Sequence, residues 1–353
     1  MALGLSRAAG LAALAWPAAA FIHWSRVESA EAGPAPEAAV GGQAVIEGVM
    51  MRGPARWTVA VREAGGRVRT NAVAYRPWAR RRPVLGRPFL RGAVVLIESL
   101  VLGIKALNYS AEVAAEDETP AVPAEPAEGT APSAPAKPAL GFWALALTFA
   151  VSLGLALALF VALPHLLSLW LGRFWGFDET SAWFHLADGL IKFAFFIGYV
   201  WAIGLIPEIG RVYAYHGAEH QVIFAFEAGE APLTTASAAR QPLCHPRCGT
   251  AFIFLVLALS ILFFAAVFPL FFAAGQNLAP LRTGAGIGLK ILLMPLLAGL
   301  AYEVTRLAGR ARPRSVWRII LVPGLWLQRL TTRRPDEAQL EVALTALNQA
   351  VGA

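Results

Sequence analysis

The chain has 353 residues, of which 57% are hydrophobic and only 15% charged, and its formal net charge is +7. Soluble domains are on average less apolar and more charged, so this composition argues against a soluble globular protein. It predicts an α-helical membrane protein with about four transmembrane helices and a small β-rich cytoplasmic module. We find no nucleic-acid-binding motif, and we assign the positive charge to membrane topology and to contact with anionic lipid head groups.

The first 86 residues are expected to hold a linker and then the β-rich module. Residues 1–40 predict an N-terminal extension, in which 8–22 resembles a weak secretory signal; we prefer an uncleaved segment that is interfacial or partly inserted in the membrane. Residues 41–86 predict the module, because 57–62 alternate in polarity and a glycine turn lets 67–73 return as a partner strand.

The next two segments differ sharply in composition. Residues 87–115 predict an amphipathic or membrane-associated helix. A fifth transmembrane span is the alternative, which we disfavour because three charged side chains would need partners in the bilayer. Residues 116–140 are rich in Pro, Ala and Glu and predict a linker without a core.

Residues 141–303 are expected to form a membrane domain of four spans. Each apolar run has about 18 to 23 residues, enough for a helix to cross a hydrocarbon core of roughly 30 Å. Lys192 and Lys290 lie near the ends of two runs and are expected to snorkel to the interface. Residues 304–353 predict a basic interfacial segment and a C-terminal helix. The four runs are 141–163, 189–206, 251–272 and 285–302.

The distribution of arginine predicts the orientation. Eleven arginines lie within 52–91 and eight within 306–334, whereas the two loops expected on the other side hold one each. Because segments rich in Lys and Arg stay in the cytoplasm, we expect a multi-pass protein of the bacterial inner membrane with both termini cytoplasmic. The loop 207–250 then faces the cytoplasm too, where reducing conditions keep its cysteines as thiols.

Three of the six histidines and both cysteines fall within this loop. His216 and His220 are four residues apart, which on a helix places both imidazoles on one face. His245 and Cys248 follow at a spacing typical of zinc sites with mixed nitrogen and sulfur ligands. We expect zinc, because thiolate suits it better than it suits manganese. His216, His220 and Cys248 are the expected ligands, and His245 is either a fourth ligand or a neighbour of the ligands.

The number of ligands decides the chemistry. Three protein ligands leave a position for water, whose pKa falls to about 7, and Glu219 could accept its proton as a general base. Four protein ligands would make the zinc structural. Adjacent helix residues point about 100° apart, which weakens the case that Glu219 faces an ion bound by His220. The alternative without metal is a set of hydrogen-bonding histidines and small core cysteines.

Four other polar residues are candidates for binding a substrate: Gln43, Glu47, Arg52 and Arg247. An arginine could hold an anionic group through paired hydrogen bonds. The structural alternative for the first three is a tight turn and a strand in the small sheet.

Three segments are similar to motifs of the YqhQ family of bacterial membrane proteins: GGQAVIEGVMMR at 41–52, YHGAEH at 215–220 and HPRCGT at 245–250. The resemblance runs from about residue 41 to residue 347 and includes 323–328 and the two threonines that follow at 331 and 332. It implies a membrane protein that is a predicted metal-dependent enzyme of unknown function. Cys244 stands just before the third motif, so it ranks below Cys248 as a ligand.

Two functions of different classes follow from these patterns. The first is a zinc hydrolase embedded in the membrane and acting at its cytoplasmic surface. The second is a non-catalytic membrane scaffold, in which a structural zinc site supports a surface that binds a partner protein. A transporter is disfavoured, because the spans show no inverted repeat and no line of membrane acids.

Overall fold

The computed structural model describes residues 40–88, 90–118, 142–177, 181–274, 282–310 and 320–352. The expected N-terminal extension lies outside them up to residue 39, as do residues 119–140 of the linker expected at 116–140. The described chain is mainly helical, with one small sheet near its N-terminal end.

Four strands form an antiparallel meander in the order β1-β2-β3-β4. A two-residue turn joins the first two strands, and Glu47 in this turn has a positive φ of 50°. The β-rich module expected from the sequence is therefore confirmed. The strands are β1 (Gly41–Val45), β2 (Gly48–Arg52), β3 (Arg56–Arg62) and β4 (Val68–Ala74).

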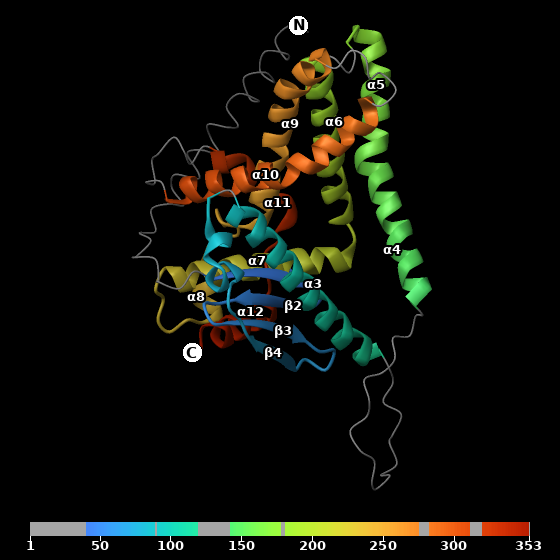
Figure 1. The fold of residues 1–353 in the computed structure, drawn as a ribbon. Coiled ribbons are helices and arrows are strands. Elements are labelled where there is room, and N and C mark those ends of the chain that lie inside the picture. The colour runs from blue at the N-terminus through green and yellow to red at the C-terminus, as the bar shows by residue number, and fades with distance from the viewer. Residues whose placement is uncertain are drawn as a thin grey trace, which may run out of the picture.

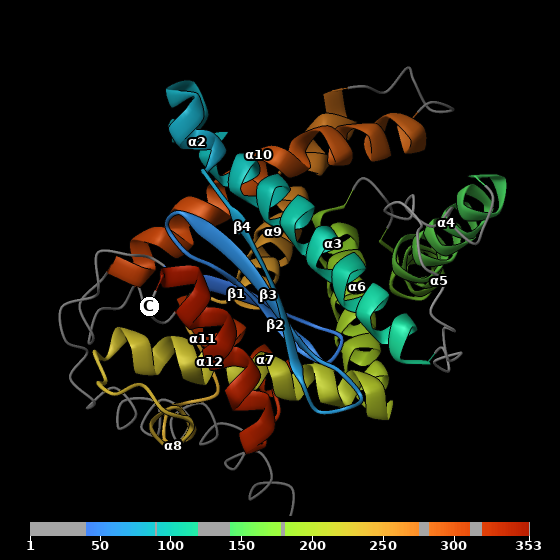
Figure 2. The same cartoon turned by 90° about the horizontal axis from the view of Figure 1, so that it is seen from below.

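The sheet lies between helices on both faces (Figure 2). The helix α3 (Leu90–Glu118) covers one face, and α7 (Pro207–Glu227) and α12 (Glu337–Val351) cover the other. Because side chains alternate along a strand, Met50 packs on the α3 side while Val49 and Met51 pack toward α7 and α12. The C-terminal helix thus completes a core begun at the N-terminus.

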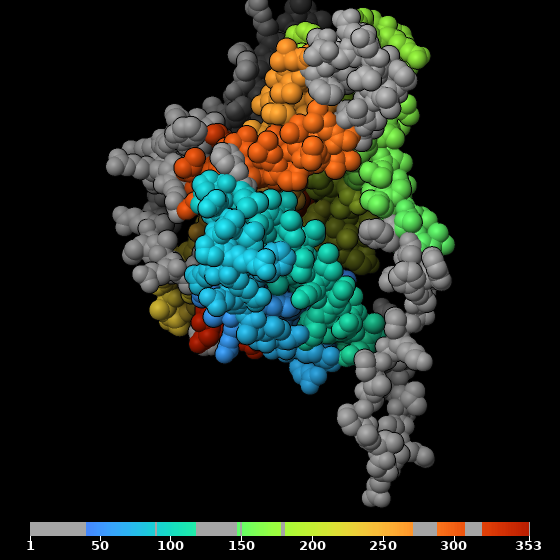
Figure 3. Space-filling view, viewed as in Figure 1, coloured from blue at the N-terminus to red at the C-terminus, as the bar shows by residue number. Residues whose placement is uncertain are grey.

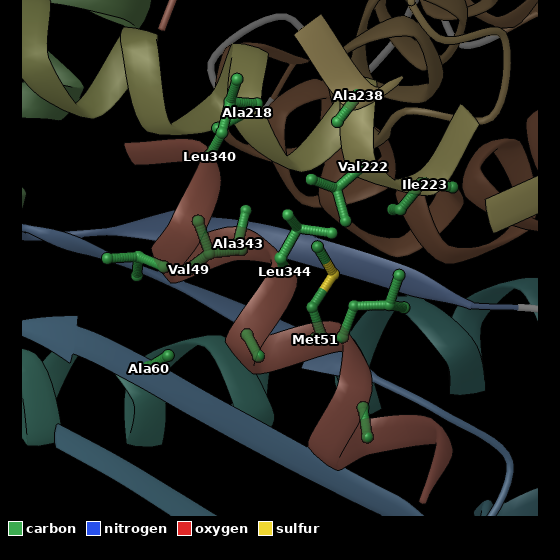
Figure 4. Packing of buried hydrophobic residues seen from close by; sticks show 14 of the residues in the cluster. Val49, Met51, Ala60, Ala218, Val222, Ile223, Ala238, Leu340, Ala343 and Leu344 are labelled. Atoms are coloured by element: carbon green, nitrogen blue, oxygen red, sulfur yellow. The ribbon is translucent and has the colours of Figure 1, made fainter. Parts of the chain in front are cut away.

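Apolar side chains from α7, α12 and the sheet interlock in the larger core (Figure 4). Ala218 and Val222 of α7 and Leu347 of α12 are completely buried. The start of α12 is set by Asp336, whose carboxylate caps the helix while Gln339 bonds back to the Asp336 backbone. Small residues on α7 let the two helices and the sheet approach closely.

Among the described residues, four helices are long and apolar enough to cross a membrane. The first is continuous: α4 (Phe142–Leu157) passes through a π-helical turn, Ala158–Ala162, into α5 (Leu163–Trp175). Figure 1 shows α5, α6 and α9 alongside one another on one side of the sheet layer, with α10 crossing in front. The other three are α6 (Ala182–Ile203), α9 (Gly249–Ala274) and α10 (Arg282–Arg310).

The first two predicted spans differ most from their bounds in the structure. The first candidate span is Ala150–Trp175, further along the chain than expected, and the second starts at Ala182. The second therefore includes Asp188, which the sequence had placed in a polar loop. Its buried carboxylate accepts a hydrogen bond from Lys192 at 2.5 Å and lies 3.9 Å from the ammonium of Lys290. Both lysines face this carboxylate, so a charged residue can sit inside an apolar helix when its partners are supplied.

The helix α3 joins the sheet to the candidate spans. Gly92 packs against Tyr302 of α10, and next to it Arg91 donates to the Glu303 carboxylate at 2.6 Å. In the space-filling view α3 spreads over the front of the sheet, with α10 above it (Figure 3). One side of α3 exposes large apolar side chains at Leu96, Ile97, Leu100, Ile104 and Leu107.

Four short elements complete the described chain. They are α2 (Trp78–Arg81), the 3-10 helix Pro83–Gly86, α8 (Thr235–Ala239) and α11 (Val322–Thr331). The last of these packs on α9, where Gly324 lies directly against Ala251. This contact brings the C-terminal segment next to the start of α9.

Leu347→Ala should lower the free energy of unfolding by about 2–5 kcal/mol, because the side chain is fully buried between α12 and the sheet and its loss leaves a cavity. Leu100→Ala is the matched control, since Leu100 is 61% exposed and should change stability by only about 0.5 kcal/mol. Thermal unfolding of the detergent-solubilised protein, followed by circular dichroism, measures both. Equal effects of the two variants would contradict the core assignment.

Candidate metal centre

The helix α7 carries the first half of the candidate centre. It begins with Pro207 at its first position and Glu208 in its first turn, both favourable at a helix N-terminus. Only three residues separate it from the end of α6 at Ile203. Cys248 immediately precedes α9, so both halves of the centre lie at ends of candidate spans.

Three side chains of the expected ligand set come together. His216, His220 and Cys248 each offer one ligand atom, and these atoms all lie within 4.8 Å of one another. Nε2 of His216 is 3.2 Å from the sulfur of Cys248, and the two imidazole rings are 4.4 Å apart between centroids. Spacing in the sequence correctly predicted that the two histidines share a face of a helix.

Backbone carbonyls orient both imidazoles. Nδ1 of His216 donates to the carbonyl of Thr331 at 2.9 Å, and Nδ1 of His220 donates to the carbonyl of Leu243 at 2.5 Å. These bonds place the proton on Nδ1 and leave the lone pair on Nε2, which for His220 is buried without a hydrogen-bond partner among the described residues. Metal-bound histidines are held by carbonyls or carboxylates in the same way. The residues therefore fit a metal ion.

The surroundings of Cys248 favour its thiolate form. Burial raises its pKa, but interaction with His220 and hydrogen bonds from Thr250 outweigh burial and leave the pKa below its ordinary value. The backbone amide of Thr250 lies 3.4 Å from the sulfur, at the N-terminus of α9, where the helix dipole also favours negative charge. In contrast, burial raises the pKa of Cys244.

His245 stays outside the group of three. Its ring lies 5.7 Å from that of His220, and its Nε2 is 3.5 Å from the carboxylate of Glu227. Its Nδ1 accepts from the backbone amide of Arg247, and burial lowers its pKa to about 4. Of the two roles expected from the sequence, this geometry favours a position beside the three candidate ligands.

Glu219 lies between α7 and the sheet. It is only 6% exposed, and burial raises its pKa to about 8, while the nearby His216 and a hydrogen bond from the Gly42 backbone oppose this rise. Gly42 is so close that a Cβ atom there would stand 2.8 Å from a carboxylate oxygen of Glu219. Glu219 is therefore a buried acid next to the three candidate ligands but outside their group.

The four candidate substrate-binding residues are not gathered at this centre. Gln43 packs against Gly103 of α3, and Arg52 lies 3.4 Å from the Ser99 hydroxyl, also on α3. Their strand positions place both on the face of the sheet away from α7. Glu47 is paired with Arg211 of α7, with one contact at 2.6 Å, and also contacts the Tyr215 hydroxyl.

Arg247, the last of these four residues, is paired with Glu227 near the end of α7. Burial lowers the pKa of its guanidinium. The pairing ties the segment that carries Cys248 to α7, so a structural role accounts for this residue.

Gln328 is a structural residue of the centre that the sequence reasoning did not single out. Its fully buried amide accepts from the backbone N–H of His245 at 2.7 Å and donates to the His245 carbonyl at 2.8 Å. The same C-terminal segment supplies the Thr331 carbonyl that orients His216. The only signal in the sequence was the motif 323–328 with its two threonines, which lies about 80 residues from Cys248.

Comparison with known proteins agrees with the resemblance seen in the sequence. The family described as "Protein of unknown function (DUF1385)" matches residues 87–353. The "Uncharacterized protein YqhQ" of Bacillus subtilis (strain 168) is 29% identical over 313 residues, covering 88% of this chain and 92% of the relative. No solved structure matches the chain.

Fold and site together define a mainly helical protein with four candidate membrane spans, a small four-stranded sheet and a His-His-Cys cluster between them. The chain belongs to the DUF1385 family, the family of YqhQ.

The two thiols should be distinguished by their pH dependence. In metal-free protein, alkylation of Cys248 in a Cys244→Ser variant should reach half of its maximal rate at a lower pH than alkylation of Cys244 in a Cys248→Ser variant. The sign follows because a lowered pKa produces the reactive thiolate at lower pH. Mass spectrometry after timed treatment with iodoacetamide measures both midpoints, and a reversed order would contradict the electrostatics described here.

Proposed function

We propose that this protein is a zinc-dependent hydrolase of the bacterial inner membrane, acting at the cytoplasmic surface. The observation that carries the proposal is the convergence of His216, His220 and Cys248, with both imidazoles oriented by carbonyls. When bound by three protein ligands, zinc acts as a Lewis acid and lowers the pKa of a water molecule in the remaining position. The contact of His245 with Glu227 supports three protein ligands over four, which would leave a position for water.

Glu219 is the residue that we propose as general base. Its buried carboxyl lies beside the ligand group and has a pKa of about 8 in the protein without metal. Such a carboxylate binds a proton more strongly than an ordinary glutamate, and a cation close by would favour its charged form before the reaction. It could therefore accept the proton of water and pass it to the leaving group.

The location of the centre supports action at a membrane surface. Cys248 leads directly into α9, so the candidate centre lies at the start of one helix that could cross the bilayer, and α7, which carries both histidines, follows a second such helix, α6. The arginine-rich segments before α3 and after α10 would lie on the same side as the centre. Under the positive-inside rule this side is the cytoplasm. The partner that we propose for the apolar helices is the lipid bilayer.

A zinc scaffold that binds a partner protein is the second candidate. The candidate ligands come from segments about 30 residues apart, and the carbonyl of Thr331 adds a third segment. An ion there would join these segments and stabilise the fold without catalysis.

Zinc content should depend on three side chains and not on their neighbours. His216→Ala, His220→Ala and Cys248→Ser should each lose most of about one zinc ion bound per chain, because three ligands hold the ion. Cys244→Ser is the matched control and should retain zinc, since Cys244 lies outside the group. Elemental analysis of the purified variants makes the measurement. Zinc loss in Cys244→Ser, or retention in Cys248→Ser, would count against this ligand set.

Glu219→Gln should retain zinc but reduce hydrolysis by about 10²–10⁴-fold, because it removes the proton acceptor while keeping the shape of the side chain. Glu208→Gln, an exposed position on the same helix, should keep full activity. A panel of peptide, ester and phosphoester probes supplies the assay. Full activity of Glu219→Gln on a probe that the unaltered protein hydrolyses would exclude the proposed base. A structural zinc predicts instead that zinc removal lowers the unfolding temperature of a protein that hydrolyses no probe.

A further inference from the structure

The strand β1 lies at one edge of the sheet. Among the described strands it pairs only with β2, so its other edge has no strand partner. The register shows which groups point to that edge. Val45 pairs with Gly48 across a two-residue turn, and such a closing pair exchanges hydrogen bonds within the hairpin.

Because the pattern alternates, Gln43 also points its backbone groups toward β2, whereas Gly42 and Ala44 point theirs away from it. The hydrogen bond from the Arg62 backbone N–H to the Glu47 carbonyl supports this alternation. It shows that the backbone groups of Glu47 point toward β3, so those of the next residue, Gly48, point toward β1. The outer edge of β1 therefore presents the backbone N–H and C=O of Ala44 and the C=O of Gly42.

This edge is next to the candidate metal centre. Gly42 lies directly against the side chain of Glu219, which is the sequence neighbour of His220. Any side chain at position 42 would collide with Glu219, so glycine allows the strand to approach α7 at this point. An extended segment added along β1 would consequently run past the carboxylate that we propose as general base.

We propose that the outer edge of β1 binds the substrate as an added strand, and that the substrate is therefore an extended polypeptide segment. The inference rests on the hydrolase proposed above and names its substrate class. A main chain offers alternating N–H and C=O groups that match those of an open edge, and binding of this kind is independent of most side chains. A lipid lacks such a row of donors and acceptors.

The reaction at this position is hydrolysis of one peptide bond. The oxygen of water bonds to the carbonyl carbon, the carbon–nitrogen bond breaks, and a proton passes to the leaving nitrogen by way of Glu219. Water is the only co-reactant, and no electrons are exchanged.

Two hydroxamate probes separate the strand edge from the metal position. Acetohydroxamic acid can bind only the metal, whereas an N-acetylated tripeptide with a C-terminal hydroxamate can also pair with β1. Isothermal titration of the zinc-loaded, full-length protein in detergent measures both affinities. We expect the tripeptide to bind at least about tenfold more tightly, and N-methylation of its amides to remove this advantage.

Ala44→Pro deletes the outward N–H without touching the bonds between β1 and β2 and should abolish the tripeptide advantage while leaving acetohydroxamic acid binding unchanged. Ala44→Ser retains the N–H and should bind as the unaltered protein does. Ala72→Pro is the second control. The β2–β3 and β3–β4 pairings show that the backbone N–H of Ala72 points away from β3, toward the opposite edge of the sheet. Zinc content and thermal unfolding of each variant report whether it is folded.

The outcomes are distinct. If the tripeptide binds no more tightly than acetohydroxamic acid, or still binds more tightly in Ala44→Pro, strand addition is overturned but the proposed hydrolase is not. An edge already covered by another segment of this chain would give the first of these results. An equal loss in Ala44→Pro and Ala72→Pro also overturns it. If zinc-loaded protein binds no acetohydroxamic acid, the open metal position is absent, and the hydrolase fails together with its substrate.

Discussion

Burial of α7 on both sides is the constraint on which the rest of the structure depends. One side contributes Ala218 and Val222 to the core beneath the sheet, and the other carries His216 and His220. A buried imidazole or amide must find a hydrogen-bond partner or a metal, because its desolvation is otherwise uncompensated. The segments packed around α7 supply these partners.

The partners are mainly backbone carbonyls from loops. Leu243 and Thr331 orient the two histidines, and the carbonyl of Gln241 accepts from the amide of Gln221 at 2.7 Å. Carbonyls fix both the direction and the tautomer of an imidazole, which is a requirement of metal ligation. The same contacts would also serve a purely structural histidine pair; the thiol of Cys248 at the N-terminus of α9 is what makes the cluster chemically suited to a soft cation.

Charged residues in the candidate spans follow the same rule in a different environment. Asp188 is buried, yet it contacts Lys192, Lys290 and the ring of His165. The contacts join α5, α6 and α10, so the cluster can hold these helices in one arrangement. A hydropathy pattern places a boundary at such a residue because it measures each side chain alone. The true boundary depends on partners from other helices.

The sequence by itself determined the classes of element. Apolar runs of span length, an alternating strand pattern before them and a His-x-x-x-His spacing on a helix could all be predicted, because each depends on residues close in the chain. Tertiary structure decided the rest. It placed α12 on the sheet, turned His245 toward Glu227, sent Gln43 and Arg52 to the α3 side, and brought Gln328 to the centre. Those outcomes depend on which distant surfaces bury one another and which buried polar groups then find partners, and local patterns carry no information on either.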